Sequence, residues 1–272
     1  LMLIILLFML LLSFFEIIQC YDVQLSSVAL NISQASYCIA DKNIWDCFTC
    51  NNENTLEYYS LHKGEYSIYG YNIEYDSIFV AFRGSSNIQN WISNAKFTKV
   101  HPYSDYILID KGFYEVFKSN KNTIYENINM ISKKYNTKKI IITGHSLGGA
   151  IGTILSFDMM YNMFPYMINL ITFGSPRVGN NEFVNLFNSY NIYSTRITHY
   201  YDIVPHLPQS LLNYKHIPQE IWYNEANSNY KICNDNFNED DTCSNSCAPL
   251  KCKSVDDHEN YMNIHMGING YC

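Results

Sequence analysis

A serine flanked by glycines is the feature of this sequence best suited to covalent chemistry. The segment Gly144–Gly149 reads Gly-His-Ser-Leu-Gly-Gly and follows the isoleucine run Ile140–Ile142. A β-branched run ending in Gly-x-Ser-x-Gly predicts a strand that turns sharply into a helix, with Ser146 at the turn. Glycines fit there because the strand and helix leave no room for a Cβ atom. The pattern predicts a nucleophilic hydroxyl open to a substrate; a glycine-rich turn with an incidental serine is the alternative.

A serine hydroxyl is a weak nucleophile unless a base removes its proton and a carboxylate orients that base. In hydrolases with such a turn, the acid and then the histidine follow the serine along the chain. Asp202 ends a predicted strand and therefore lies at the same sheet edge as the serine turn, whereas Asp158 falls within a predicted helix. For the base, His258 lies in polar sequence before a short apolar turn. Spacing alone leaves four downstream rivals open, which are His199, His206, His216 and His265.

The tetrahedral intermediate of acyl transfer needs backbone N–H donors. One is expected from Leu147, directly after the nucleophile. The second is expected from Ser85, because the apolar strand Ser77–Phe82 ends in a Gly-Ser turn there. An ordinary Gly-Ser turn is the alternative.

A short apolar segment follows this turn. Ile88, Trp91 and Ile92 share one face of a predicted short helix. An apolar face beside an oxyanion loop predicts a helical lid that covers the site when closed and meets lipid when open. A core helix with a buried tryptophan is the alternative.

Strands and helices alternate along the chain, which predicts an α/β fold with a central, mostly parallel sheet flanked by helices. The predicted strands are Ser77–Phe82, Lys139–Thr143, Asn169–Phe173 and Tyr193–Tyr201. The predicted helices are Asp22–Ala40, Lys111–Tyr135, Ala150–Met160 and Asn181–Tyr190. The polar stretch Asn224–Lys253 predicts a loop stapled by its cysteines.

Size and charge limit the function classes. The 272 residues are 47% hydrophobic and carry a formal net charge of −7 without a basic cluster, so nucleic acid is not an expected partner. Residues 1–20 contain the apolar run Leu1–Phe15, which is short for a membrane span and typical of a signal peptide. An uncleaved anchor is the alternative. A single domain is expected over residues 21–272.

Cysteine usage points to an oxidising compartment. Removing Cys20 with the leader leaves eight of the nine cysteines, an even number that suits disulfides. Zinc is the alternative, suggested by Cys47-x-x-Cys50 and the cluster at 243–252, but neither has paired histidines at metal-finger spacing. The sequon at Asn31 fits the same secretory compartment as a glycosylation site.

These segments together resemble the class 3 triacylglycerol lipases of the filamentous-fungal type. The resemblance covers nearly the whole chain after the leader. Its landmarks are Ser36–Cys38, Trp45–Cys50, Phe82–Trp91, Lys111–Phe113, Gly144–Gly149, Ser175–Gly179, Asp202–Pro208, Asp257–Tyr261, Gly267–Asn269 and Cys272. The family's catalytic histidine stands in a D-H-x-x-Y context, matched here at His258. The resemblance implies an α/β-hydrolase fold, with the roles given above for Ser146, Asp202, Ser85 and Leu147 and a lid around Ile88.

The resemblance also implies three disulfides, Cys38–Cys272, Cys47–Cys50 and Cys233–Cys243. Cys247 and Cys252 fall where the relatives considered lack cysteines, and we infer that they pair with each other. Gln89 stands in the lid segment where some relatives carry arginine, so a charge-assisted open lid is not implied.

The expected function is that of a secreted serine carboxylester hydrolase, a triacylglycerol lipase acting on acylglycerols at a lipid–water interface. Alternatives on the same scaffold are a phospholipase A1 or a feruloyl-type esterase, and, from another class, a non-catalytic lipid-binding protein. No metal or cofactor is expected, and the expected state is a monomer.

Overall fold

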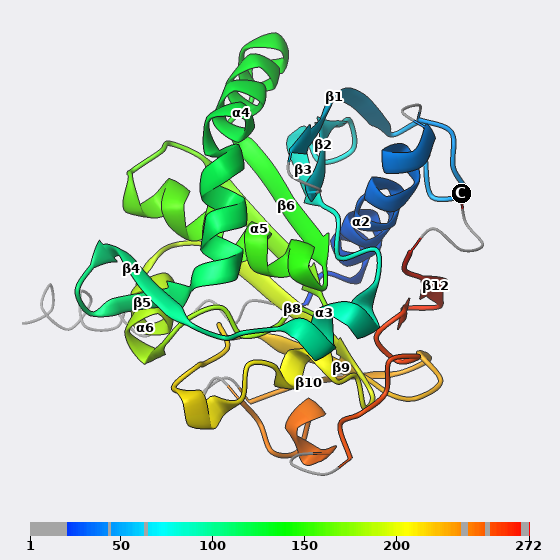
Figure 1. The fold of residues 1–272 in the computed structure, drawn as a ribbon. Coiled ribbons are helices and arrows are strands. Elements are labelled where there is room, and N and C mark those ends of the chain that lie inside the picture. Colours follow the sequence, from blue (N-terminus) through cyan, green and yellow to red (C-terminus); the bar gives the residue numbers. More distant parts are fainter. Residues whose placement is uncertain (1–20, 43–44, 63–64, 235–238, 248–250, 268–271) are drawn as a thin grey trace, which may run out of the picture.

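One large sheet organises the computed structural model, which describes residues 21–42, 45–62, 65–234, 239–247, 251–267 and 272 (Figure 1). Its eight strands lie in the order β1-β2-β3-β6-β7-β8-β9-β10. They are β1 (Asn54–His62), β2 (Glu65–Asn72), β3 (Ser77–Phe82), β6 (Lys139–His145), β7 (Met167–Phe173), β8 (Tyr193–His199), β9 (Glu220–Tyr223) and β10 (Tyr230–Ile232). Strands β3, β6, β7, β8 and β9 run parallel, and the antiparallel pairs lie toward the two edges. The prediction of a central, mostly parallel sheet is confirmed.

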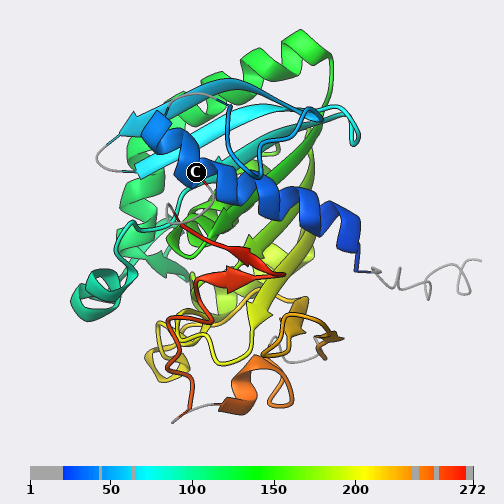
Figure 2. The ribbon, with the colours of Figure 1, turned by 90° about the vertical axis from the view of Figure 1, so that its right-hand side faces the viewer.

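Helices cover both faces of the sheet. Three of them, α4 (Lys111–Tyr135), α5 (Leu147–Tyr161) and α6 (Asn181–Ser189), pack on one face, and α2 (Val23–Lys42) crosses the other (Figure 2). Strand β6 serves both cores because successive side chains of a strand point to opposite faces. Its Ile140 and Ile142 join the core under α4 and α5, whereas Ile141 joins the core under α2, and all three are fully buried.

Smaller elements surround the edge of the sheet at which the parallel strands end. They are α3 (Ile88–Asn94), the hairpin β4 (Lys99–Ser104) with β5 (Ile107–Asp110), the 3₁₀ turns η1 (Val204–His206), η2 (Ser210–Leu212) and η4 (Ser244–Cys247), and the hairpin β11 (Asn260–Tyr261) with β12 (Ile264–His265). The β11–β12 hairpin lies beside α2 in the sequence-coloured view of Figure 2. The last described segments of the chain therefore lie against its first described helix.

Most predicted elements occur where the sequence places them. The helix Lys111–Tyr135 has the predicted bounds, with the Asp110 side chain accepting from the Phe113 N–H at its start and Asn136 in the left-handed conformation at its end. The predicted strand Tyr193–Tyr201 ends earlier, at His199. The prediction that Asn224–Lys253 is only a loop is wrong in part, because strand β10 and turn η4 lie within it. These pieces have three and four residues and are too short to leave a periodic apolar signal.

Four disulfides join the pairs that the resemblance implies, together with the inferred fourth pair. They are Cys38–Cys272, Cys47–Cys50, Cys233–Cys243 and Cys247–Cys252. The first spans 234 positions and ties α2 to the end of the chain, whereas the other three close short loops of 3, 10 and 5 positions. Three of the four have cysteines in the part of the sequence before or after His258; they are Cys38–Cys272, Cys233–Cys243 and Cys247–Cys252.

The sequon at Asn31 lies inside α2 rather than in a surface loop. Asn31 is partly exposed, but the Ser33 side chain that completes the sequon is fully buried. Glycosylation acceptors are expected on surface loops, so this placement argues against modification of Asn31 in the folded chain.

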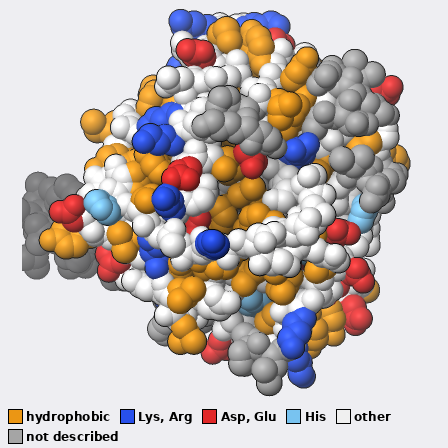
Figure 3. All heavy atoms as spheres, viewed as in Figure 1, with side chains coloured by type: hydrophobic (Ala, Val, Ile, Leu, Met, Phe, Trp, Pro, Cys, Tyr) orange, Lys and Arg blue, Asp and Glu red, His pale blue; other side chains and the backbone are white. Residues whose placement is uncertain are grey.

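Charges of both signs are interspersed on the face of the molecule seen in Figure 3, where the described lysine, arginine and acidic side chains alternate with apolar ones. No helix among the described residues is long and apolar enough to cross a membrane. The predicted leader, residues 1–20, lies outside the described residues.

Candidate active site

Ser146 stands at the turn between β6 and α5 with an unusual backbone conformation, φ +58° and ψ −128°. Its N–H donates to the Phe173 carbonyl of the neighbouring strand at 2.9 Å, which fixes the turn to the sheet. A Cβ atom on Gly148 would collide with the Phe82 carbonyl, and one on Gly144 would collide with the backbone of Gly148. The glycines therefore allow strand, turn and helix to approach closely enough to hold the serine at this strained position.

Asp202 and His258 form a buried pair. Asp202 follows β8, and its Oδ2 lies 2.9 Å from Nδ1 of His258. The other carboxylate oxygen accepts the Val204 N–H at 2.8 Å, and the Tyr261 hydroxyl donates to Oδ2 as well. Both side chains of the pair are only 1% exposed. A carboxylate held this way fixes the imidazole with Nδ1 protonated and leaves Nε2 as the basic nitrogen.

His258 and Ser146 line the same cavity, which has a volume of about 210 Å³. The Oγ atom of Ser146 and the Nε2 atom of His258 are both buried, and neither has a hydrogen-bond partner among the described residues. Burying two polar atoms without hydrogen-bond partners lowers the stability of the fold. A substrate in the cavity would supply the missing partners. Catalytic hydrogen bonds often tighten only when the substrate complex forms.

The serine hydroxyl is covered in this structure, where Ser146 is only 2% exposed. The expectation of an open hydroxyl is therefore wrong for this state. The cavity is enclosed by the segment after β3 and by the chain around His258. Its lining residues are Tyr37, Ser85, Ser86, Ile88, His145, Ser146, His258, Glu259, His265, Met266 and Gly267.

His145 supports the site without contacting Asp202. Its Nδ1 lies 2.7 Å from the Tyr37 hydroxyl, and its Nε2 lies 2.8 Å from the carbonyl oxygen of His258. Burial, followed by the nearby imidazole of His258, holds the pKa of His145 well below its usual range. The ring is thus neutral, with Nε2 donating to the carbonyl and Nδ1 accepting from Tyr37. Through this chain of contacts His145 anchors the backbone of the predicted base.

The rival histidines are engaged elsewhere. His199 and His216 bond to the backbone carbonyls of Asp257 and Pro205, at 2.9 and 2.6 Å. His206 lies against the Cys247 sulfur. His265 lines the cavity from strand β12 but is not hydrogen-bonded to Asp202. Of the histidines in the described part of the chain, His258 is the one paired with Asp202.

Of the two predicted oxyanion donors, Ser85 lines the cavity, and Leu147 directly follows the cavity-lining Ser146. Leu147 is the first residue of α5, so its N–H has no acceptor within the helix and lies at the positive end of the helix dipole. Ser85 lies in the segment after β3. The preceding residue, Gly84, is packed so closely that a Cβ atom there would lie 2.8 Å from the His145 carbonyl and 3.1 Å from the Ser146 Cβ. The chain just before Ser85 therefore lies against the serine turn.

The predicted lid residues take two different positions. Helix α3 is capped by Asn87, whose side chain accepts the Asn90 N–H at 2.9 Å, and its Ile88 is buried against the cavity. Trp91 instead stacks on Phe113, with ring centroids 6.2 Å apart, outside the cavity lining. Ile92 is partly exposed. The structure therefore brings one of the three, Ile88, to the site, because the tryptophan finds a partner in the core under α4.

Three residues of the site were not assigned a role from the sequence. Tyr261 shares Asp202 with His258, and Tyr37 supports His145. Gly174, at φ +56°, follows β7, and a Cβ atom there would lie within 3 Å of Asp202 Oδ2 and His258 Nδ1. Tyr37 and Tyr261 stand in segments that the family resemblance singles out. Gly174 has a weaker signal, a glycine directly after a predicted strand.

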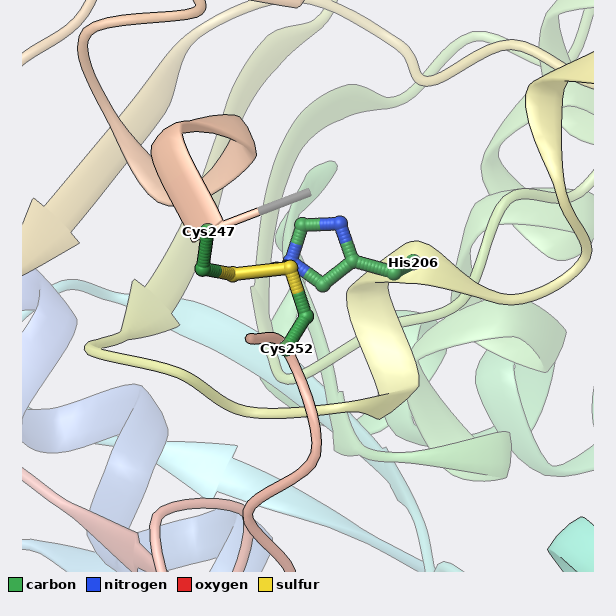
Figure 4. A group of neighbouring side chains, drawn as sticks. All are labelled: His206, Cys247 and Cys252. Carbon is green, nitrogen blue, oxygen red and sulfur yellow. Dashed lines mark hydrogen bonds between the residues drawn. A yellow bond between two sulfur atoms is a disulfide. The ribbon is translucent and has the colours of Figure 1, made fainter. Parts of the chain in front are cut away.

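The cysteines that suggested zinc are bonded to each other. In the described chain, the histidine, cysteine and acidic groups close enough to share an ion are His206 with Cys247 and Cys252, and Cys233 and Cys243 with Asp240. Figure 4 shows the first group, in which a disulfide links the two sulfur atoms next to the imidazole. A sulfur held in a disulfide is not the thiolate that binds a metal.

A serine on a strand–helix turn, followed in the chain by a hydrogen-bonded Asp–His pair at one edge of a parallel sheet, defines a serine hydrolase of the α/β-hydrolase fold. The model of the lipase (class 3) family matches residues 79–212. The chain is 31% identical over 255 residues to the lipase of Rhizomucor miehei, covering 87% of this chain and 68% of the relative. The chain belongs to the class 3 lipase family.

Further relatives agree with this assignment. The chain is 35% identical over 148 residues to the secreted mono- and diacylglycerol lipase 1 of Fusarium solani, over 53% of this chain and 43% of the relative. It also resembles the lipase of Rhizopus niveus, at 30% identity over 87% of this chain and 62% of the relative. A solved Rhizomucor miehei lipase–propeptide complex superposes with a TM-score of 0.82 at 29% identity, over 90% of this chain and 81% of that one.

Proposed function

We propose that this chain is a secreted lipase that hydrolyses the carboxylic esters of acylglycerols at a lipid–water interface. The observation that carries the proposal is the convergence of Ser146 and the Asp202–His258 pair on one buried cavity. The class 3 lipase relatives support the ester chemistry and the lipid substrate. The secreted Fusarium relative and the four disulfides support export, with residues 1–20 as the leader and residues 21–272 as one catalytic domain.

The reaction proceeds in two halves. Ser146 Oγ attacks the ester carbonyl while His258 Nε2 takes its proton, and Asp202 stabilises the imidazolium that forms. The N–H groups of Ser85 and Leu147 hold the negative oxygen of the tetrahedral intermediate. His258 then gives its proton to the leaving alcohol, and a water molecule activated by the same imidazole hydrolyses the acyl-enzyme. No step uses a metal or cofactor.

Helix α3 is proposed as the lid. In the described state Ser146 is buried and Ile88 lines the same cavity, and outward movement of α3 would open that cavity to a long acyl chain. The helix has seven residues and packs on the core through Trp91. At a lipid surface, outward movement of α3 would expose Ile88, and burial of this side chain in lipid would offset its removal from the protein interior.

Hydrolysis of emulsified triolein, tributyrin, phosphatidylcholine and a feruloyl ester tests this function. We expect triglyceride hydrolysis that rises sharply once tributyrin exceeds its solubility and forms droplets. We also expect a fluorophosphonate probe to label wild-type protein and not Ser146→Ala. Preference for phosphatidylcholine or the feruloyl ester would replace the lipase assignment with one of the alternatives, and absence of labelling and hydrolysis would favour a non-catalytic lipid-binding protein.

A further inference from the structure

His206, Cys247 and Cys252 form a second cluster of side chains able to do chemistry, and none of them lines the cavity of Ser146 (Figure 4). One nitrogen of the imidazole and the two sulfur atoms all lie within 4.8 Å of one another. In the described state the two sulfur atoms are joined in a disulfide. The cluster therefore brings together one nitrogen and two sulfur atoms that a soft metal ion could bind once that disulfide is opened.

The spacing of these atoms matches tetrahedral zinc coordination. Zn²⁺ binds cysteine sulfur at about 2.3 Å and histidine nitrogen at about 2.0–2.1 Å, so a sulfur and a nitrogen on one tetrahedral ion lie about 3.6 Å apart. The Nε2 atom of His206 and the Sγ atom of Cys247 are 3.6 Å apart. Cys247 and Cys252 also have the Cys-x₄-Cys spacing, which falls within the range typical of zinc ligands.

The disulfide of this cluster can be opened without unfolding the chain. Cys252 and His206 line a second cavity, of about 330 Å³, which gives a reductant and a metal ion a route to the cluster. The disulfide closes a loop of only 5 positions. In the chain-entropy model its reduction therefore costs much less stability than reduction of Cys38–Cys272, which spans 234 positions.

The cluster lies where the chain segments of Asp202 and His258 meet. His206 belongs to η1, which begins two residues after Asp202. Cys252 stands two residues before Ser254, whose backbone forms a β-bridge with Asp202. The disulfide closes its own loop alone, whereas an ion held by all three side chains would also tie that loop to η1.

We propose that His206, Cys247 and Cys252 form a zinc site that is masked by the disulfide and becomes available when the disulfide is reduced. A dithiol reductant supplies two electrons and two protons to the S–S bond, which becomes two thiols, and is itself oxidised to a disulfide. Zn²⁺ then displaces the two thiol protons and binds both thiolates and the imidazole Nε2, with water in the fourth position. The site takes no part in ester hydrolysis and does not depend on the proposed function.

Zinc binding by the full chain tests the proposal. A phosphine replaces the dithiol as reductant, because a dithiol would compete for the metal. Zinc is titrated into the oxidised and the reduced protein in competition with a chromophoric chelator. We expect the reduced protein to bind one Zn²⁺ with a Kd of about 0.1 μM or tighter, and the oxidised protein to bind it at least about 100-fold more weakly. Equal binding by the two forms overturns the inference.

Alkylation identifies the cysteines that bind the ion without any substitution. In the reduced protein, Zn²⁺ should slow alkylation of Cys247 and Cys252 by iodoacetamide at least about tenfold, as followed by peptide mass spectrometry, because a metal-bound thiolate is a poorer nucleophile than a free one. Cys233 and Cys243 are the internal control, since with Asp240 they form the other such cluster among the described residues. Protection of this control pair instead, or a Cys247–Cys252 bond that opens only when the chain unfolds, overturns the inference.

Three variants of the reduced protein locate the ligands. Cys247→Ser/Cys252→Ser should lose tight zinc binding, and His206→Gln should bind zinc about 100-fold more weakly because one of three ligands is gone. The matched control, Cys233→Ser/Cys243→Ser, should bind zinc as the wild type does. Circular dichroism checks the folding of each variant. An unchanged zinc affinity in both site variants overturns the inference, and if the double serine variant does not fold, the alkylation pattern of the wild type decides.

Discussion

The two halves of the candidate site are built in different ways. Ser146 is held by local structure, a continuous strand, turn and helix of the buried sheet and its cover. His258 is held by long-range contacts in a polar segment with little regular structure. Its supports are the carboxylate of Asp202, the hydroxyl of Tyr261 bonded to that same carboxylate, and the side chain of His145.

The covalent and ionic links of the second half compensate for its weak secondary structure. Arg177 makes a bidentate ion pair with Glu239, at 2.9 and 2.7 Å, where both residues are largely buried. The disulfide Cys233–Cys243 closes the loop that contains Glu239, and the disulfide Cys247–Cys252 closes the next loop along the chain. The backbone of Ser254 then pairs with Asp202 and leads to His258. A nucleophile can thus be encoded locally, whereas its base depends on the completed fold.

The largest expected effect is on catalysis, where Ser146 and His258 should act as one catalytic unit. Ser146→Ala and His258→Ala should each reduce kcat for tributyrin on the order of 10⁶-fold, and the double variant should be no worse than either. Both act in the same step, since the imidazole is useful only when it can deprotonate the serine. Initial rates with melting curves as the folding control measure this. Losses that multiply in the double variant would mean that the two side chains act independently.

The second prediction concerns the covalent closure of the histidine half. Cys38–Cys272 closes a loop of 234 positions and Cys47–Cys50 one of 3 positions. In the chain-entropy model, replacing both cysteines of the long closure by serine should lower the free energy of unfolding by about 5 kcal/mol, against about 2 kcal/mol for the short one. Urea denaturation measures both. Equal losses would show that local contacts, and not loop closure, dominate.

The third prediction targets the contact between the two halves. Gly174→Ala places a methyl group 2.8 Å from Asp202 Oδ2 and 2.9 Å from His258 Nδ1, at a residue with φ +56°. The backbone strain should cost about 1–2 kcal/mol of stability, and separation of the Asp–His pair should reduce kcat about 100-fold.

Gly152→Ala is the matched control, since its Cβ would also be tightly placed, 3.2 Å from Ile142, but within the serine half and away from the pair. It should leave kcat within about twofold. If Gly174→Ala loses stability but keeps its kcat, the Asp–His pair tolerates displacement and is less tightly positioned than its distances indicate.

The same contrast explains what the sequence alone could predict. The strand before Ser146, its glycines and the helix Lys111–Tyr135 are local patterns with one dominant periodicity, and the predicted positions agree with the structure. The choice among the downstream histidines could not be made from spacing, because only the fold brings residue 258 to residue 202. It was the family resemblance that singled out His258.

Other features left no local signal. The sequence predicted an apolar lid face containing Trp91, but the packing of that ring on Phe113 depends on a separate helix further along the chain. The glycine after the predicted strand at Gly174 indicates a tight turn, but not that Asp202 and His258 would occupy the space of its missing Cβ atom. Strand β10 has only three residues, all of them exposed, which is too short for a periodic pattern from which a strand could be inferred.

The last prediction uses a titratable group within the histidine half. His206 Nε2 lies 3.6 Å from the Cys247 sulfur (Figure 4), and burial, with the Arg177 cation as a smaller cause, lowers the pKa of His206 to about 4. An unfolded histidine has a pKa near 6.5. Between these values the unfolded chain binds more protons than the folded one, so the free energy of unfolding falls as pH falls from about 6.5 to 4 and is level above that range.

From pH 7 to pH 5 this single group should cost about 2 kcal/mol of stability, at about 1.4 kcal/mol per unit of pKa shift. His206→Gln should reduce the fall by that amount but not abolish it, because His145 and His216 also have lowered pKa values and contribute in the same direction. Urea midpoints at the two pH values measure the effect, with His101→Gln, an exposed histidine, as the control. If the urea midpoints of wild type and His206→Gln depend on pH in the same way, the disulfide-closed loops around His206 admit water freely. Disulfides and hydrogen bonds, and not a buried core, would then position the catalytic histidine.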